Sequence, residues 1–141
     1  MREIPHPAPA SILLVEDEVA ALELLADIVP RKFPGVALYT ATNGRKALEL
    51  FKAHLPDIVI TDINMPEMNG VQMAGEIRAI KPDTKFIVIT GDAGKISLES
   101  SIGEGFEIDH YIEKPIDFGL LFAGIEECIG QIKREKPVPP S

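Results

Sequence analysis

Five short apolar runs alternate along the chain with longer segments of helical periodicity, and this alternation restricts the available folds more than any other feature. Each run has four or five residues, many of them β-branched. Runs that are apolar nearly throughout suit strands covered on both faces. The predicted strands span residues 12–15, 36–40, 58–61, 86–89 and 108–112.

The segments between these runs have helical spacing and recognisable ends. Pro30 is expected to halt the first helix, while Asn43 and Asp117 offer N-caps to the second and the last. The fourth helix is the weakest expectation, because glycines surround it and it has few apolar residues. The predicted helices span residues 19–29, 44–54, 70–80, 92–102 and 118–132.

Five strand-then-helix units with short connections predict an α/β fold, in which right-handed crossovers place helices on both faces of a parallel sheet. The expected architecture is one small, doubly wound domain over residues 11–134. Half of the 12 prolines lie outside it. We therefore expect residues 1–10 to form a Pro-rich N-terminal extension and residues 135–141 to form a C-terminal tail or linker.

The charge is negative and unevenly distributed. The chain has 141 residues, with 22 Asp and Glu against 14 Lys and Arg, which gives a net charge of −8. Residues 92–127 alone contain nine acids and two lysines. Such a segment repels phosphate backbones, so direct nucleic-acid binding by this domain is not expected.

Nothing in the sequence suggests a membrane or secretory protein. No run approaches the roughly 18 apolar residues of a membrane span, and the first ten residues lack the apolar core of a signal peptide. The single cysteine, Cys128, cannot form an internal disulfide. A cytoplasmic location without membrane attachment is the expectation.

Polar residues directly follow four of the five predicted strands. Glu16 and Asp17 follow the first, Asp62 the third, Thr90 the fourth and Lys114 the fifth. Because the carboxyl ends of parallel strands share one edge of the sheet, these side chains are expected to meet in one crevice. Clustered carboxylates suit a hard divalent cation such as Mg²⁺, and a lysine and a hydroxyl beside them suit a bound anion.

Each of these residues also has an ordinary structural explanation. Glu16 and Asp17 could cap the first helix, Asp62 could open a turn, and Thr90 and Lys114 could be a strand end and a solvated surface group. Four separate strand ends that contribute such groups to one crevice are harder to explain by capping and solvation alone.

Residues 11–132 resemble the receiver domain of two-component response regulators. The resemblance rests on five motifs: the acidic pair Glu16-Asp17, the strand that ends at Asp62, the loop Asn-Met-Pro-Glu-Met-Asn-Gly at 64–70, the end Ile-Thr-Gly at 89–91, and Tyr-Ile-Glu-Lys-Pro at 111–115. It implies a flavodoxin-like (βα)5 fold with strand order 2-1-3-4-5.

The resemblance also implies a role for each site residue. Asp62 would be the phosphoacceptor. Mg²⁺ would be bound by Asp17, Asp62 and the backbone carbonyl of Asn64, with Glu16 acting through water. Thr90 and Lys114 would contact the phosphoryl group, Tyr111 would be the switch aromatic, and the bond between Lys114 and Pro115 would be cis.

By the same resemblance, the function is a phosphorylation-dependent signalling switch rather than an enzyme. Its own chemistry would be limited to Mg²⁺-dependent self-phosphorylation from a phosphodonor and slow autodephosphorylation. The expected partners are a sensor histidine kinase or a phosphotransfer protein, and a downstream effector domain or protein. The output face would combine the fourth helix, fifth strand and fifth helix, with a phosphorylation-dependent homodimer as one candidate form.

Three alternative functions compete with this interpretation. A P-loop around Gly91 to Lys95 would need glycine at position 89 and Ser or Thr after the lysine, but the chain has Ile89 and Ile96. A haloacid-dehalogenase-type phosphatase uses Asp-x-Asp, whereas this chain has Asp62-Ile-Asn64. A phosphate-independent interaction module with the same fold remains the main competitor. The sequence leaves open whether the domain stands alone or belongs to a longer regulator or hybrid kinase.

Overall fold

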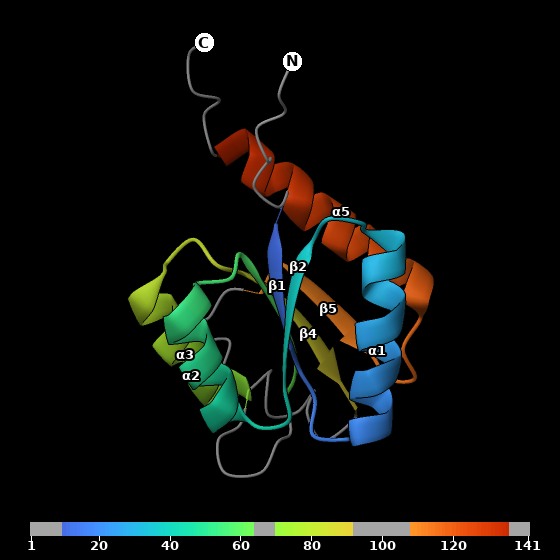
Figure 1. The fold of residues 1–141 in the computed structure, drawn as a ribbon, viewed down its shortest axis with the longest axis horizontal. Coiled ribbons are helices and arrows are strands. Elements are labelled where there is room, and N and C mark those ends of the chain that lie inside the picture. The colour runs from blue at the N-terminus through green and yellow to red at the C-terminus, as the bar shows by residue number, and fades with distance from the viewer. Residues whose placement is uncertain (1–9, 64–69, 92–107, 136–141) are drawn as a thin grey trace, which may run out of the picture.

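The computed structural model describes residues 10–63, 70–91 and 108–135, which form a parallel five-stranded sheet with helices on both faces (Figure 1). The strand order is β2-β1-β3-β4-β5, as expected for a flavodoxin-like domain. The strands are β1 (Ser11–Val15), β2 (Ala37–Ala41), β3 (Ile58–Asp62), β4 (Lys85–Thr90) and β5 (His110–Glu113). The helices are α1 (Val19–Lys32), α2 (Gly44–His54), α3 (Gly70–Ile80) and α5 (Phe118–Glu135).

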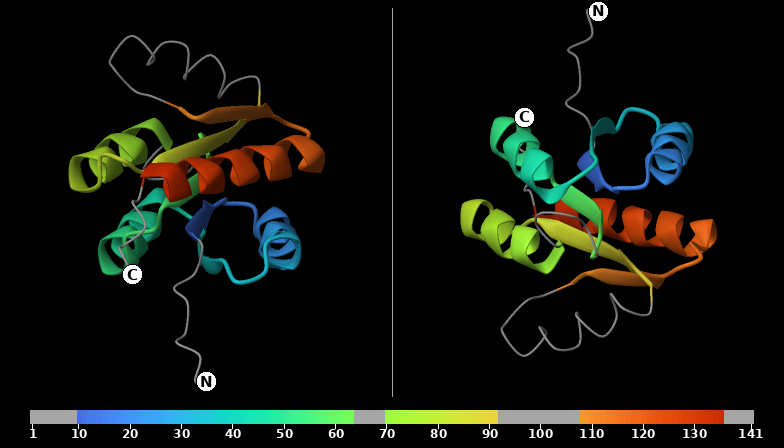
Figure 2. Two further views of the ribbon diagram at one scale, coloured as in Figure 1. Left: turned by 90° about the horizontal axis from the view of Figure 1, so that it is seen from above. Right: turned by 90° about the horizontal axis from the view of Figure 1, so that it is seen from below.

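Alternate residues of the central strands build two separate cores. Ile12 of β1 lies in register with Ile58 of β3, and both face the core under α1 and α5. Their neighbours Leu13 and Val59 face the opposite core, under α2 and α3. The end-on views show one helix pair on each face of the sheet (Figure 2). In a strand covered on both faces, every side chain is buried in one core or the other. This explains why the central strands are apolar almost throughout.

The edge strands depart from this expectation. In β2, four of the five residues are partly or fully exposed, and in β5 only Ile112 is buried. Each edge strand has a sheet neighbour on one side only, so its side chains receive less cover. The observed ends of these strands also differ from the predicted ones: β2 lies one residue later, and β5 begins at His110 rather than at Ile108.

The helix ends confirm two predicted caps and correct one predicted stop. The side chain of Asn43 accepts a hydrogen bond from the Lys46 amide at 2.8 Å, and that of Asp117 accepts one from the Leu120 amide at 3.2 Å. Pro30, however, lies inside α1, which continues to Lys32. The expected helix over residues 92–102 lies outside the described residues.

The continuation past Pro30 has a local explanation. A proline so near the end of a helix removes one hydrogen bond, but the last turn still closes, because the Phe33 amide bonds to the Val29 carbonyl at 2.9 Å. Val29 is fully buried and anchors this turn on the sheet. Packing therefore outweighs the local cost of the proline.

Candidate functional site

The parallel strands bring the predicted site residues to one edge of the sheet. Asp62 ends β3 and Thr90 ends β4, while Glu16 and Lys114 directly follow β1 and β5. Asp62 and Glu16 are only 5% and 6% exposed, and Thr90 is fully buried. Polar groups buried at this depth need partners, so the contacts among them define the site.

Three carboxylates form the acidic part of the site. Oxygens of Glu16, Asp17 and Asp62 lie within 4.8 Å of one another. Glu16 and Asp62 are buried, and Asp17 is exposed to solvent. Oxygen donors this close together repel one another and suit a hard divalent cation, so this donor set fits Mg²⁺.

The alternative explanation of Glu16 and Asp17 as helix caps is not supported. The N-cap residue of α1 is Glu18, and its side chain forms no capping hydrogen bond. Glu16 is instead buried beside Asp62. The two acids therefore belong to the rim of the sheet rather than to the helix end.

Lys114 places a positive charge against two of these carboxylates. Its Nζ lies 2.5 Å from Asp62 Oδ2 and 3.6 Å from Glu16 Oε1. Partial burial lowers the pKa of Lys114, but the hydrogen bond from its ammonium to Asp62 and the nearby negative charges outweigh this effect, and the net pKa is raised. The ammonium therefore stays charged beside Asp62.

Glu16 is the carboxyl most affected by the cluster. Its burial raises the pKa, and the hydrogen bond and charge of Asp62 raise it further, to about 7, although Lys114 opposes the shift. Without a cation other than Lys114, the cluster therefore favours a proton on Glu16.

Thr90 on β4 and Tyr111 on β5 are the other two side chains to which the resemblance assigns a role. The Thr90 hydroxyl donates to the carbonyl oxygen of its neighbour Gly91 at 2.8 Å. Tyr111 on β5 is 38% exposed. The Lys114 amide donates to the Thr90 carbonyl at 2.8 Å, so the backbone joins the ends of β4 and β5.

Two further features complete the site. The peptide bond between Lys114 and Pro115 is cis, as the resemblance implied. Thr61, which the sequence analysis did not single out, donates its hydroxyl to the Asp62 carbonyl at 2.9 Å and is buried. Only its place directly before Asp62 could have indicated this contact. Asn64, the expected third metal ligand, lies outside the described residues.

The fold and the site define a doubly wound α/β domain with an acidic, lysine-bearing crevice at the carboxyl edge of its sheet. Residues 12–126 match the family model of the response regulator receiver domain. The chain therefore belongs to the receiver domain family of response regulators, and so to two-component signalling.

Curated relatives agree with this assignment. The chain is 38% identical over 104 residues to the chemotaxis protein CheY of Thermotoga maritima, a match that covers 74% of this chain and 84% of that protein. It is 33% identical over 125 residues to the uncharacterised transcriptional regulatory protein YesN of Bacillus subtilis, covering 88% of this chain. The chain spans 33% of YesN and 27% of GlrR, a transcriptional regulatory protein of Escherichia coli.

Solved structures agree as well. A response regulator receiver domain protein from Clostridium thermocellum superposes with a TM-score of 0.80 at 27% identity, covering 90% of this chain and 99% of that one. An uncharacterised protein from Neptuniibacter caesariensis gives a TM-score of 0.82 at 26% identity, covering 96% and 99%.

Family membership carries several general properties. Receiver domains are phosphoacceptor switches, generally not enzymes, and they bind Mg²⁺ at an acidic site of the kind formed here by Glu16, Asp17 and Asp62. Response regulators act with kinases and effector domains. Among the helices of the described segments, none is both long and apolar enough to cross a membrane.

Proposed function

We propose that this domain is a signalling switch that accepts a phosphoryl group on Asp62 from a histidine kinase or a phosphotransfer protein. The observation that carries the proposal is the contact between Lys114 and Asp62, 2.5 Å apart, inside a cluster of three carboxylates. A buried carboxylate beside a fixed cation is suited to receive a phosphoryl group, because the cation offsets the negative charge that this group brings.

The chemistry required is a transfer between two anions. A carboxylate oxygen of Asp62 forms a bond to phosphorus while the bond from phosphorus to the donor breaks, and the product is an acyl phosphate. Lys114 neutralises charge on the phosphoryl oxygens as they arrive. Bound Mg²⁺ supplies further positive charge to these oxygens. Hydrolysis by water then returns the carboxylate and inorganic phosphate, so the domain has only self-phosphorylation and slow autodephosphorylation of its own.

For the metal ligands we propose the set that the family resemblance implies. Asp17 and Asp62 would hold Mg²⁺ directly, together with the backbone carbonyl of Asn64, and Glu16 would act through water.

Thr90 and Tyr111 would convert phosphorylation into a change of surface. The Thr90 hydroxyl now donates to the Gly91 carbonyl, a bond that it can exchange for one to a phosphoryl oxygen. Tyr111, exposed on β5, would then turn inward. The output face proposed for this switch is α4-β5-α5, of which β5 and α5 are described, and Leu120 on α5 is 60% exposed.

We place the switch in residues 11–134, between a Pro-rich extension and a C-terminal tail or linker, in the cytoplasm. Cys128 is a free, buried cysteine, and burial raises the pKa of its thiol to about 12. The proposed output is a contact with an effector domain or protein, or a phosphorylation-dependent homodimer, without direct nucleic-acid binding by this domain.

The test is the intact mass of the protein after incubation with Mg²⁺ and acetyl phosphate. The unmodified chain should gain one phosphoryl group, and Asp62→Asn should gain none. Asp83→Asn is the matched control, because Asp83 is exposed and paired with Lys81 on a different part of the chain. If the unmodified chain gains nothing, or if Asp62→Asn is labelled normally, the proposal fails and the phosphate-independent interaction module takes its place.

A further inference from the structure

Thr61, the residue directly before Asp62 on β3, carries a hydroxyl into apolar surroundings. It lies in register with Val15 of β1 and Val88 of β4, and all three residues are buried. Because Thr61 is two residues from Val59, its side chain is on the face of β3 that packs under α2 and α3. Valine has nearly the same shape as threonine, so packing alone does not account for the hydroxyl. Burial of a hydroxyl is costly unless it forms a hydrogen bond.

A chain of hydrogen bonds begins at this hydroxyl. It donates to the Asp62 carbonyl at 2.9 Å. That carbonyl belongs to the peptide group between Asp62 and Ile63, and the N–H of the same group donates to the Ile89 carbonyl of β4 at 3.3 Å. This second bond is longer than the roughly 2.9 Å that is usual. A donor on the oxygen of a peptide group polarises the group and strengthens the bond that its N–H makes, so the hydroxyl supports a weak link at the end of β3.

The chain continues to Thr90 and Lys114. The Ile89 carbonyl that receives the bond from β3 is part of the same peptide group as the Thr90 N–H. On the other side of Thr90, its own carbonyl accepts a hydrogen bond from the Lys114 amide at 2.8 Å. The backbone of Asp62, the proposed phosphoacceptor, is therefore connected to the backbones of the two residues proposed to contact the phosphoryl group.

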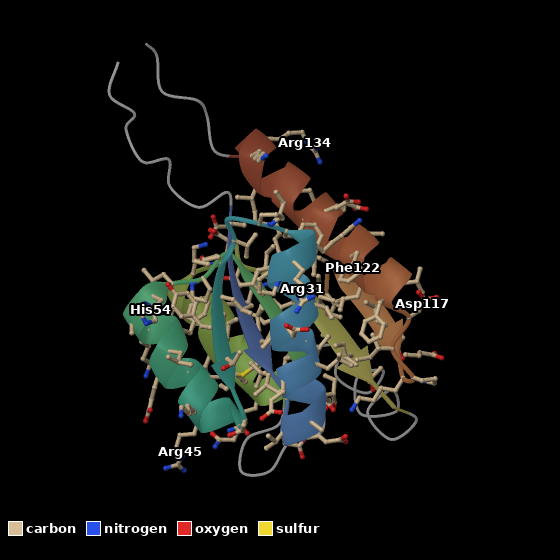
Figure 3. All side chains as sticks on the ribbon, turned by 45° about the vertical axis from the view of Figure 1, so that its right-hand side comes forward. Arg31, Arg45, His54, Asp117, Phe122 and Arg134 are labelled. Carbon is tan, nitrogen blue, oxygen red and sulfur yellow. The ribbon has the colours of Figure 1, made fainter. Side chains whose placement is uncertain are left out.

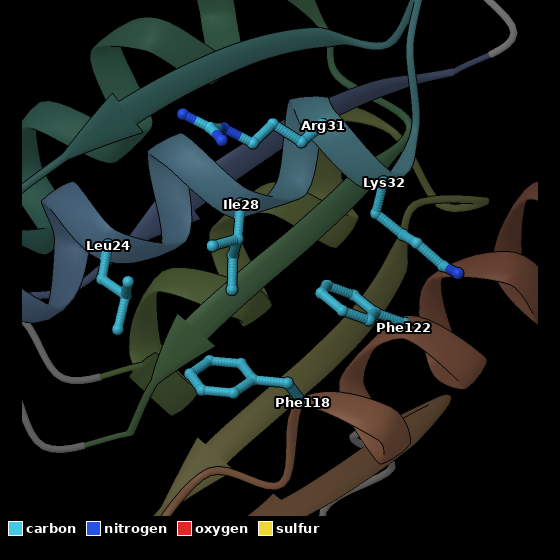
Figure 4. A pocket seen from close by; sticks show the side chains of 6 residues that line it. All are labelled: Leu24, Ile28, Arg31, Lys32, Phe118 and Phe122. Atoms are coloured by element: carbon cyan, nitrogen blue, oxygen red, sulfur yellow. The ribbon is translucent and has the colours of Figure 1, made fainter.

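The position of Thr61 excludes a direct contact with a phosphodonor. Figure 3 shows α2, which ends at His54, on one side of the sheet, and α5, which begins after Asp117, on the other. The surface groove of about 420 Å³ between α1 and α5, shown in Figure 4, thus opens on the face that Thr61 does not line. Thr61 itself is only 1% exposed. Its hydroxyl therefore acts through the backbone of Asp62.

We infer that Thr61 is a positioning residue for phosphorylation: its hydroxyl holds the peptide group after Asp62 and thereby aims the Asp62 carboxylate at Lys114. The inference rests on the proposed function of Asp62 and adds a residue to it. The Lys114 ammonium is 2.5 Å from Asp62 Oδ2, and so close a contact depends on the backbone angles of Asp62. A small displacement of a reacting group lowers the rate of a transfer that relies on alignment.

The first test is the rate of labelling by acetyl phosphate at fixed Mg²⁺, followed by intact mass. Thr61→Val should slow labelling about fivefold, the ratio expected for the loss of one neutral hydrogen bond. Thr61→Ser keeps the hydroxyl and should restore most of the rate.

Thr84→Val is the matched control. Thr84, directly before β4, is also 1% exposed, and its hydroxyl also donates to a backbone carbonyl, that of Lys81 at 2.8 Å. Urea denaturation should show a similar loss of stability for Thr84→Val and Thr61→Val. Thr84→Val should nevertheless be labelled at the normal rate, because it lies at the opposite edge of the sheet from Asp62.

The second test needs no phosphoryl group. In proton–nitrogen correlation spectra of the unphosphorylated protein, the Ile63 amide proton should move to lower frequency in Thr61→Val, because its hydrogen bond to Ile89 weakens. The Thr90 amide should shift with it, and Thr84→Val should leave both resonances in place. A general loss of stability would not single out these two amides, and the same spectra check that each variant is folded.

The outcomes separate this inference from the proposed function. Absence of labelling in the unmodified chain would overturn both. Normal labelling of Thr61→Val in the presence of a labelled unmodified chain overturns the inference alone. It is also overturned if Thr84→Val is labelled as slowly as Thr61→Val, if Thr61→Ser restores nothing, or if the Ile63 amide does not move.

Discussion

Lys114 and Asp62 face each other across the carboxyl edge of the sheet, with the ammonium 2.5 Å from Oδ2, although 52 residues separate them in the sequence. The contact joins the end of β3 to the end of β5, on either side of Thr90 at the end of β4. In the proposed transfer, the cation would already be in place before the phosphoryl group arrives. A charge held in place in advance needs little reorganisation during transfer, which is the main source of electrostatic catalysis.

Removal of this charge should slow phosphorylation. We expect Lys114→Ala to reduce the rate of labelling by acetyl phosphate about tenfold or more, or roughly 1.4 kcal/mol in the barrier. The measurement is the time course of intact mass at fixed Mg²⁺. Lys81→Ala, which removes a lysine paired with Asp57 instead, should keep the normal rate. Equal rates for Lys114→Ala and the unmodified chain would contradict the proposed role of Lys114.

Tyr111 should report the switch directly. The chain has no Trp and two Tyr residues, so Tyr39→Phe leaves Tyr111 as the only strong emitter. Tyr39 stacks on His54 with centroids 4.2 Å apart, a contact that Phe can keep. We expect addition of beryllofluoride and Mg²⁺, which mimic the acyl phosphate, to change the fluorescence of Tyr111 and protect it from quenching by iodide.

The same measurement tests the role of Thr90. Thr90→Val has nearly the same shape but has no hydroxyl to move from Gly91 to the phosphoryl group. It should bind the mimic while Tyr111 stays accessible to iodide. A normal response of Tyr111 in Thr90→Val would separate the aromatic from the hydroxyl and refute their coupling.

The acidic cluster should make the stability of the metal-free protein depend on pH. The pKa of Glu16 is raised from 4.5 to about 7 in the folded state, so the folded protein binds more protons than the unfolded chain in this interval. The contribution of Glu16 to the free energy of unfolding is therefore largest below pH 4.5 and falls as the pH rises to about 7, by up to roughly 3 kcal/mol.

This dependence can be isolated by substitution. In EDTA, Glu16→Gln should lose the decline that Glu16 causes, so the difference in unfolding free energy between the two proteins should change between pH 4.5 and 7. Urea denaturation at several pH values measures it. Saturating Mg²⁺ should reduce the decline in the unmodified protein, because the cation compensates the charge of the cluster. The assignment is wrong if Glu16→Gln and the unmodified chain show parallel profiles in EDTA.

A second carboxylate, at the amino edge of the sheet, should affect stability but not phosphorylation. Asp57 Oδ2 accepts hydrogen bonds from the amide and the hydroxyl of Ser11 at 3.0 and 3.3 Å, and Oδ1 pairs with Lys81 at 3.1 Å. Its side chain is 13% exposed. We expect Asp57→Ala to cost about 2–3 kcal/mol, since it leaves buried donors without this acceptor.

Asp83→Ala provides the comparison. Asp83 is 63% exposed and lies 3.8 Å from Lys81, so its removal should cost less than about 0.5 kcal/mol. Urea denaturation compares the two variants, and folded Asp57→Ala should still be phosphorylated. A cost for Asp57→Ala as small as that for Asp83→Ala would mean that this cluster is not a significant tie between β1 and the end of α3.

The sequence predicted the central elements well because local pattern and tertiary position agree there. In β1, Ile12 and Leu13 are both apolar because each face of the strand meets a helix layer. Cys128, on the last helix, is fully buried in the core under α1 and α5. Pro30 shows the opposite case: a local rule indicated a helix end, but the buried Val29 and the packing of the last turn overrode it.

The site could be predicted in composition but not in geometry. The positions of Glu16, Asp62 and Lys114 after their strands indicated one shared edge. That Glu16 is buried, paired with Lys114 and raised in pKa depends on contacts between residues 98 apart in the sequence, which no local pattern contains. The hydrogen bond from the Thr61 hydroxyl to the Asp62 carbonyl joins sequence neighbours, but it depends on the side-chain rotamer of a buried strand residue, which the sequence pattern does not specify.

The all-parallel sheet has a consequence for how such a domain can be recombined with others. β1 starts at the amino edge of the sheet, and α5, which runs antiparallel to the strands, returns to that edge by Glu135 (Figure 1). The described part of the chain thus begins and ends at the pole opposite Asp62. Sequence joined at either end meets the body of the domain far from the acidic crevice, so gene fusion can change what the domain is attached to without covering Asp62.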